Sequence, residues 1–251
     1  MQGLRPIEVV SAGLRKVALP PLARPAVLPT DEPTEGLVLW GVNYYAYSAV
    51  AHVRTVLEGL TLLADASNIP TAFFAARNIF EWTAHACYMS RNLANYAGRK
   101  EWNRAWKLLS VAATGNHWMK DYGPKYGPIP GFDGMFDGIP DPLSIANVVA
   151  AYDEYRRQQF GKGDAKEDSG LLSEYSHPNS ACTDQYHEYS GREVRFITPS
   201  TGSPLPCVNR CLIELMMFLD ELLRIGREKV VRPQVVCVLK EIADLAPKTR
   251  P

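Results

Sequence analysis

Hydrophobic residues recur every three or four positions over two long stretches in the first half of the chain. Between about Leu39 and Ala66, the residues with this spacing are Tyr44, Tyr47, Val50, Val53, Leu57 and Leu60. A spacing of one helical turn predicts an amphipathic α-helix whose apolar face packs inward. A second helix is expected from Pro70 to about Ala97, because proline is favoured in a first turn and Gly98 favours a stop. Two long helices joined by a short connection predict an antiparallel helical hairpin.

Weaker patterns extend the helical prediction to the rest of the chain. Further helices are expected at about 99–120, 143–160, 169–176, 206–230 and 234–245, with a charged turn at Gly161–Asp168. The segment Tyr122–Pro142 is rich in Gly, Pro and aromatic residues and predicts a long loop, a feature that is often functional. Alternation over Tyr186–Thr198, with Ser190-Gly191 as a turn, predicts a small β-hairpin. The predicted fold class is all-α: an antiparallel helical bundle with a long Gly/Pro/aromatic loop and one small β-hairpin.

Prolines divide the N-terminal region from the rest. Pro20, Pro21, Pro25, Pro29 and Pro33 block helix formation and favour an extended path. We therefore expect a proline-rich arm over residues 1–36, a single helical domain over residues 37–246 and a short tail over residues 247–251. Apolar residues of the arm that are available to pack onto the domain are Val9, Val10, Val17 and Leu19.

Composition restricts the partners. The chain has 251 residues, of which 46% are hydrophobic, so it can bury a large core. Lys+Arg and Asp+Glu both total 27, so net charge gives no general attraction to nucleic acid or to a membrane. The stretch Arg91–Lys107 is locally basic and contains Trp102 and Trp106, which indicates either a surface for single strands or, as we favour, a solvated helix face.

The cysteines and the expected lack of a signal peptide indicate the cellular compartment. The five cysteines have no regular spacing, which predicts reduced, mostly buried thiols and a cytoplasmic protein. No signal peptide and no membrane-spanning segment are expected.

Three charged or titratable residues form a stripe on the second predicted helix. Arg77, Glu81 and His85 are spaced four apart, so their side chains lie on one side of a helix. Their neighbours are apolar, so we expect each of the three to be partly buried and to need a partner. Arg54 and Glu58, also four apart, are expected to join Arg77 and Glu81 in an ion network between the two helices. This network is either the floor of a site or, as we favour, a structural cluster that fixes helix register.

A polar segment, Leu172-Ser173-Glu174-Tyr175-Ser176-His177-Pro178, follows much later in the sequence. Pro178 disfavours helical backbone at His177, which predicts that this histidine lies at a helix end. The helix dipole favours a cationic histidine there, and a histidine tuned in this way suits a general acid or base. The alternative is a helix-end histidine bonded to a backbone carbonyl. Glu174-x-x-His177 has the spacing of di-iron ligands but lacks a second such motif, so neither a metal nor another cofactor is expected.

Two short motifs carry a resemblance to known proteins. The pairing of "ARNIFEW" with "LLSEYSHPNS" resembles a set of uncharacterised bacterial all-helical domains, over roughly Asn43–Ser180. More remotely, the arrangement is similar to HEPN-type helical bundles. Those bundles are often metal-independent ribonucleases or nucleic-acid-associated toxins with an Arg and a His in their site, usually across a dimer. In HEPN nucleases the Arg and His lie on one helix, four to six residues apart, whereas seven residues separate Arg77 and His85.

The residue analysis and the resemblance together give two hypotheses. In the first, a bacterial, homodimeric protein acts on RNA, and its candidate catalytic residues are His177, Arg77, Glu81 and Glu174. Its candidate substrate-binding residues are Arg54, Glu58, His85, Tyr175 and Asn179. In the second, the protein is a non-catalytic helical interaction module that forms a homodimer through its helical faces, and the same polar residues are satisfied internally. The first hypothesis depends on the Leu172–Pro178 segment meeting the stripe in space.

Overall fold

The computed structural model describes residues 5–23, 33–65, 69–114, 143–176, 187–190, 193–196 and 205–245. Within these residues the fold is all-α, as predicted. Its helices are α1 (Arg5–Lys16), α2 (Glu35–Asp65), α3 (Ile69–Gly98), α4 (Trp102–Thr114), α6 (Ile145–Phe160), α7 (Ala165–Ser176), α9 (Leu205–Ile225) and α10 (Val231–Ala243).

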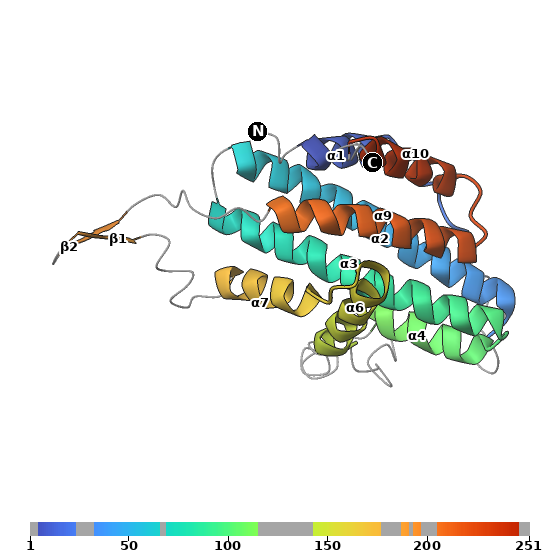
Figure 1. Ribbon diagram of the computed structural model, residues 1–251. Helices are drawn as coiled ribbons and strands as arrows, with labels where there is room; N and C mark the ends of the chain where they lie inside the picture. Colours follow the sequence, from blue (N-terminus) through green and yellow to red (C-terminus); the bar gives the residue numbers. More distant parts are fainter. Residues whose placement is uncertain are drawn as a thin grey trace, which may run out of the picture.

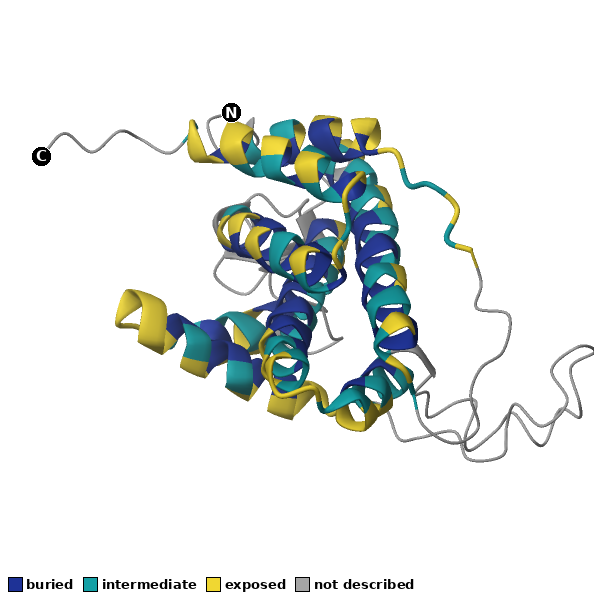
Figure 2. Cartoon of the chain, turned by 90° about the vertical axis from the view of Figure 1, so that its right-hand side faces the viewer, coloured by how far each residue is buried: buried dark blue, intermediate teal, exposed yellow. Residues whose placement is uncertain are grey.

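Helix α3 lies at the centre of the fold. It packs against α2, α4, α6, α7 and α9, while α1 packs against α2, α9 and α10. Figure 1 shows the long helices α2, α3 and α9 side by side, with α1 and α10 along one edge and α4, α6 and α7 along the other. Because several helices surround α3, apolar residues are buried on more than one of its sides, including Phe73, Ile79, Phe80, Cys87, Met89 and Leu93. Figure 2 shows the same arrangement from a second direction, with the buried positions facing the interior.

The first described helix corrects the prediction for the N-terminal region. Residues Arg5–Lys16 form α1, and Ile7, Val10 and Leu14 on that helix are fully buried. The prediction of an extended arm was therefore wrong for this segment. The proline-rich stretch begins only at Pro20, and Pro6 stands in the first turn of α1, where proline is tolerated. Gly13 lets α1 approach α10 closely, because an added Cβ would lie 2.6 Å from Cγ2 of Val238.

The inward face of α2 is rotated slightly from the predicted one. Tyr47, Val50, Val53, Leu57 and Leu60 are buried as expected. Tyr44, which the periodicity assigned to the same face, is 48% exposed, and its neighbour Tyr45 is only 6% exposed. Because Tyr44 and Tyr45 are equally hydrophobic, the hydrophobic pattern alone could not show which of the two is buried. The difference matters because Tyr45 lines the candidate site described below.

Helix α7 begins at Ala165, four residues before the predicted start at Ser169. The reason is a cap from another helix. Oδ1 of Asp153 on α6 accepts hydrogen bonds from the backbone N–H groups of Ala165 (3.0 Å) and Lys166 (3.3 Å). These N–H groups have no partner inside the helix, so a carboxylate at this position stabilises the first turn. The predicted turn at Gly161–Asp168 was therefore too long.

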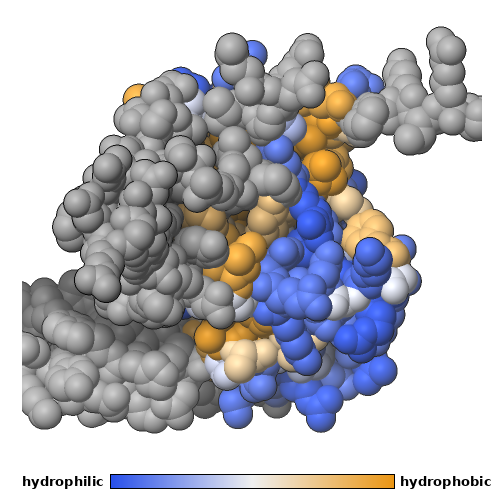
Figure 3. Space-filling view, turned by 60° about the vertical axis from the view of Figure 1, so that its left-hand side comes forward, coloured by the Kyte–Doolittle hydropathy of each residue, from blue (hydrophilic) through white to orange (hydrophobic). Residues whose placement is uncertain are grey.

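Two short strands, β1 (His187–Ser190) and β2 (Glu193–Phe196), pair antiparallel with His187 opposite Phe196. They lie where the hairpin was predicted. The predicted loop Tyr122–Pro142 lies outside the described residues, as does the tail. In the described part of the chain, no helix combines the length and the apolar character needed to cross a membrane. Some hydrophobic side chains are nevertheless exposed, among them Leu62, Phe74 and Phe160. Figure 3 shows hydrophobic residues beside a hydrophilic area on one face of the molecule.

Candidate functional site

The stripe predicted on the second helix is present on α3. Nε of Arg77 donates a hydrogen bond to Oε1 of Glu81 over 2.8 Å, and the two side chains are 29% and 35% exposed. His85 lies one turn further along the same side and is also half-buried. The stripe therefore combines an ion pair with a neighbouring imidazole at the boundary between core and solvent.

The predicted ion network between the first two long helices does not form. Glu58 on α2 lies 3.8 Å from Nε of Arg15 on α1, measured to its Oε1, so it faces α1 rather than α3. Arg54 makes no ion pair with any residue that the structure describes. The prediction failed because it took the N-terminal region to be an arm, whereas α1 packs against α2. The polar contact from α2 to α3 is instead the pair His52–Asn78, in which Nε2 lies 2.7 Å from Oδ1.

The helix that leads into the Leu172–Pro178 segment packs against the stripe helix. Helix α7 contacts α3, and Leu172 is fully buried. Figure 1 shows that α7 runs back along α3, so its C-terminal end lies by the first turns of α3. Within the described residues α7 reaches Ser176. His177 and Pro178 lie outside them, so the helix end expected at His177 stays a prediction. The side chains of Glu174 and Tyr175, together with His177 and Asn179, lie outside what the structure describes.

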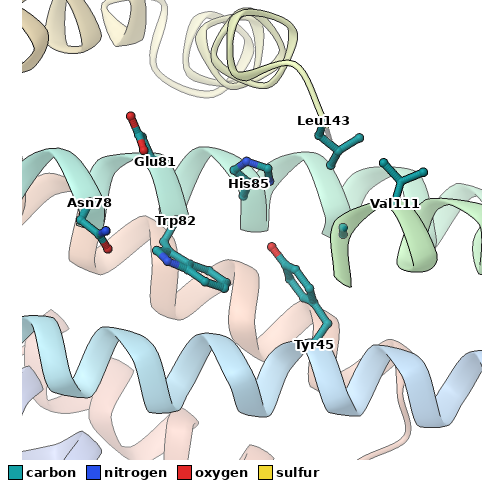
Figure 4. A pocket seen from close by; sticks show the side chains of 8 residues that line it. Tyr45, Asn78, Glu81, Trp82, His85, Val111 and Leu143 are labelled. Carbon is teal, nitrogen blue, oxygen red and sulfur yellow. The ribbon is translucent and has the colours of Figure 1, made fainter. Parts of the chain in front are cut away.

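A cavity of about 300 Å³ opens beside the stripe, between α2, α3 and α4. Glu81 and His85 of the stripe line it together with Tyr45, Asn78, Trp82, Val111, Ala112 and Leu143. Figure 4 shows Tyr45 rising from α2 with its hydroxyl directed toward α3, where His85 lies, and Trp82 between the two helices. Two of the residues predicted for the site therefore lie at one pocket, and its aromatic lining was not predicted.

Tyr45 is the most unusual group in this pocket. Its hydroxyl is buried and has no hydrogen-bond partner among the described residues. Burial also raises the pKa of Tyr45, so the phenol keeps its proton and remains a donor. A buried hydroxyl without a partner costs about 1–3 kcal/mol, so a native structure rarely leaves one without a reason.

The aromatic and amide groups around Tyr45 hold one another in place. The Trp82 ring centroid lies 6.0 Å from that of Tyr45 and 5.1 Å from that of His52. Because an amide oxygen only accepts, His52 donates from Nε2 to Oδ1 of Asn78. The Asn78 amide group is thereby fixed with its NH₂ group available as a donor.

His85 can act as an acceptor in this pocket. Burial lowers its pKa below the ordinary value, and the negative charge of Glu81 opposes this effect without cancelling it. His85 is therefore neutral at pH 7, with one ring nitrogen able to accept a proton or a hydrogen bond.

A second polar cluster lies between α6, α7 and α9. Arg156 is 1% exposed and bonds through its guanidinium to Asp164 (2.9 Å), Asp168 (2.6 Å) and Glu214 (3.1 Å). The hydroxyl of Tyr152 donates to Oε2 of Glu214 and accepts from Nη2 of Arg156. The patterns in the sequence did not predict this cluster, although one signal was present. Glu214 is the only charged residue between Cys211 and Leu219, in an otherwise apolar stretch.

The described cysteines are free, and three of the four are buried, as predicted. Burial raises the pKa of Cys87 to about 12, so this thiol stays protonated. Cys237 is exposed. In the described part of the chain, no three His, Cys, Asp or Glu side chains are grouped so that they could hold a metal ion.

The basic and aromatic stretch Arg91–Lys107 covers the end of α3 and the first half of α4, and its contacts agree with the interpretation as a solvated helix face. Trp102 and Trp106 pack against the core, and Arg104 pairs with Glu101 over 3.0 Å at the surface. Arg91 lies over the ring of Tyr155.

In comparisons with known proteins, no protein family matches this chain, and no curated protein or solved structure is significantly similar to it. The function therefore has to be argued from the site.

Proposed function

We propose that this chain is a helical-bundle protein that associates with RNA through the α3 stripe and the Leu172–Pro178 segment, and cleaves it without a metal ion. The observation that carries the proposal is the packing of α7 along α3. It brings the helix that leads into His177 alongside the helix that holds Arg77 and Glu81. Residues nearly a hundred positions apart in the sequence thus belong to neighbouring elements.

The residue types suit phosphodiester chemistry. The guanidinium of Arg77 would bind the phosphate oxygens and stabilise the charge that develops on them. His177 would act as the general acid or base, for which a helix-end imidazole is suited. Glu81 already orients Arg77 through the 2.8 Å hydrogen bond, and Glu174 would orient His177. The half-exposed stripe would be open to a substrate.

A cleavage assay on labelled single-stranded RNA in excess EDTA tests the proposal. The wild-type protein should cut the RNA, and His177→Ala should slow cleavage by about 100-fold or more, the usual contribution of a general acid or base. Arg77→Ala should reduce both binding and cleavage. Arg224→Ala is the matched control, because Arg224 is an arginine on α9 that is 58% exposed and belongs neither to the stripe nor to the basic stretch Arg91–Lys107. Absence of RNA binding by the wild-type protein, or equal cleavage by His177→Ala, would overturn the proposal.

A specific observation favours a second candidate, a non-catalytic interaction module that forms a homodimer. Nε of Arg77 and Oε1 of Glu81 are 2.8 Å apart, so each residue neutralises the charge of the other. The pair can therefore stabilise α3 without binding a substrate. In this case Arg77→Ala and His177→Ala should each lower the melting temperature. Neither variant should lose a catalytic activity, because the wild-type protein would have none. Sedimentation of the wild-type protein should then show a dimer, and a monomer would count against this candidate.

A further inference from the structure

We propose that the pocket between α2, α3 and α4 binds one neutral, planar heteroaromatic ring that carries hydrogen-bond donors and acceptors on its edge, the chemical class of the nucleobases. The four residues that carry the argument are Tyr45, Asn78, Trp82 and His85. The inference does not rest on the proposed function, because the pocket could take a free ligand in a protein that never contacts RNA.

The size of the pocket sets the size of the ligand. Its volume of about 300 Å³ is at the lower end of the range for small-molecule sites, which runs from about 300 to about 1,000 Å³. A ligand of one or two fused rings fits this volume, and a dinucleotide does not.

The hydroxyl of Tyr45 calls for an acceptor from outside the protein. It is buried, has no partner among the described residues and is directed toward His85 across the pocket. An acceptor on a ligand ring would satisfy it and would recover the cost of leaving a donor unpaired. This is the observation that distinguishes the pocket from an ordinary packing gap.

Asn78 supplies a second directed donor. Its oxygen is occupied by His52, so its NH₂ group remains for a ligand, and its orientation is set before the ligand arrives. His85 and Glu81, on the same helix, supply acceptors to the lining of the pocket. The pocket therefore offers donors and acceptors close together, which matches a ring edge that has both C=O and N–H groups.

Trp82 supplies an aromatic surface for the ring. Contacts with Tyr45 and His52 hold the indole in position, so it loses little conformational freedom when a ligand stacks on it. A base can stack on an aromatic side chain whatever its sequence identity, because every base has a flat π face. Polar edges and an aromatic surface together favour a heteroaromatic ring over an aliphatic ligand.

The charges in the pocket argue against an anion. Glu81 is the only charged residue among the described lining residues, and its charge is balanced by Arg77. No cation lines the described part of the pocket to bind a phosphate. The ring itself is therefore the recognised part, and any attached phosphate would have to lie outside.

Calorimetric titration with adenosine, guanosine, cytidine and uridine tests the proposal, with benzene as an apolar probe. At least one nucleoside should bind, and Tyr45→Phe should weaken that binding by about tenfold, the loss expected for one hydrogen bond of about 1.4 kcal/mol. Tyr44→Phe is the matched control, because the neighbouring Tyr44 is 48% exposed and does not line this pocket. This control should bind the nucleoside as the wild-type protein does.

A second variant guards against an effect of misfolding. Ala112 lines the pocket from α4, and Ala112→Leu should fill it and abolish nucleoside binding without removing an internal hydrogen bond. Melting temperatures of all variants show whether they fold. Any of three outcomes would overturn the proposal. The first is that no nucleoside binds with a Kd of about 1 mM or lower, which corresponds to a binding free energy of about 4 kcal/mol. The others are that benzene binds as tightly as the nucleosides, or that Tyr45→Phe folds and binds the nucleoside as the wild-type protein does.

The nucleoside titration and the RNA cleavage assay test the two proposals separately. Nucleoside binding without RNA cleavage would support the pocket and reject the proposed function. RNA cleavage without nucleoside binding would support the proposed function and reject the pocket.

Discussion

Two polar clusters inside this helical protein differ in how well their groups are paired. In the α6–α7–α9 cluster, Arg156 contacts three carboxylates, and the hydroxyl of Tyr152 both donates and accepts. In the α2–α3–α4 pocket, the hydroxyl of Tyr45 has no partner among the described residues. Both tyrosines are buried, and burial raises the pKa of both. The difference therefore lies in their partners and not in their depth.

The comparison separates a structural use of buried polar groups from a binding use. A cluster whose groups bond to one another has little capacity left for a ligand, and it fixes the arrangement of the helices that contribute to it. One oxygen of Glu214, Oε1, is the exception, since it is buried without a partner in the described residues. A pocket that leaves a donor unpaired next to an open volume keeps its bonding capacity for a ligand. Arg156 and Glu214 also line a cavity, of about 310 Å³, so an open volume does not by itself separate the two clusters. Because nearly all the polar groups of the first cluster are paired with one another, we assign stability to it and recognition to the second.

The largest expected effect is the loss of Arg156. Arg156→Met should lower the free energy of unfolding by about 3–5 kcal/mol, because it leaves Glu214 as a buried carboxylate without its cation and leaves Asp168 with only the more distant Arg210. Urea denaturation measures this change. Arg224→Met is the matched control, since its pair with Glu221 is at the surface (58% and 33% exposed) and should contribute less than about 1 kcal/mol.

The double variant Arg156→Met/Glu214→Leu sharpens the same test. Removing both partners avoids the unpaired charge, so part of the lost stability should return. If Arg156→Met were no more harmful than Arg224→Met, the cluster would not have the structural role that we assign to it.

The second prediction compares the two buried tyrosines directly. Tyr152→Phe should cost about 1.5–3 kcal/mol, because its hydroxyl bonds to the charged groups of Glu214 and Arg156. Tyr45→Phe removes a hydroxyl without a protein partner, so it should cost nothing or stabilise the free protein by up to about 1 kcal/mol. Urea denaturation without ligand measures both. Equal losses in the two variants would show that Tyr45 is satisfied within the protein and would remove the contrast.

The same comparison shows what the sequence could and could not predict. Local patterns were sufficient for most of the helices, because periodicity and a stop such as Gly98 act over a few residues. They missed α1 and the first turn of α7. The stripe of Arg77, Glu81 and His85 was also found, because spacing along one helix is a local property. Pairing between helices was not found. Glu58 forms an ion pair with Arg15, and Arg156 forms one with Glu214; both pairings depend on how the helices rotate and pack.

The pocket was missed for a related reason. Its lining combines α2, α3 and α4, and Tyr45 is distinguished from Tyr44 only by the side of α2 that faces inward. An unpaired hydroxyl has no signature in a sequence, because it is defined by what is absent around it in three dimensions.

The smallest expected effect concerns the pH dependence of stability at the pocket. Burial lowers the pKa of His85 in the folded protein, whereas in the unfolded chain a histidine titrates near about 6.5. Below that pH the unfolded chain therefore binds a proton that folded His85 does not, so stability falls as the pH is lowered toward the folded pKa. His85→Gln should flatten this part of the stability curve, measured by urea denaturation between about pH 7 and the onset of acid unfolding.

Glu81→Gln provides the matched arm of this test. The charge of Glu81 raises the pKa of His85 and so partly offsets the effect of burial. Without that charge the folded pKa should fall further, and the loss of stability should extend to lower pH. A His85→Gln curve that parallels the wild-type curve would mean that His85 is solvated like a surface histidine. The pocket would then be open to water, and the unpaired hydroxyl of Tyr45 beside it would no longer indicate a ligand, because water could satisfy it.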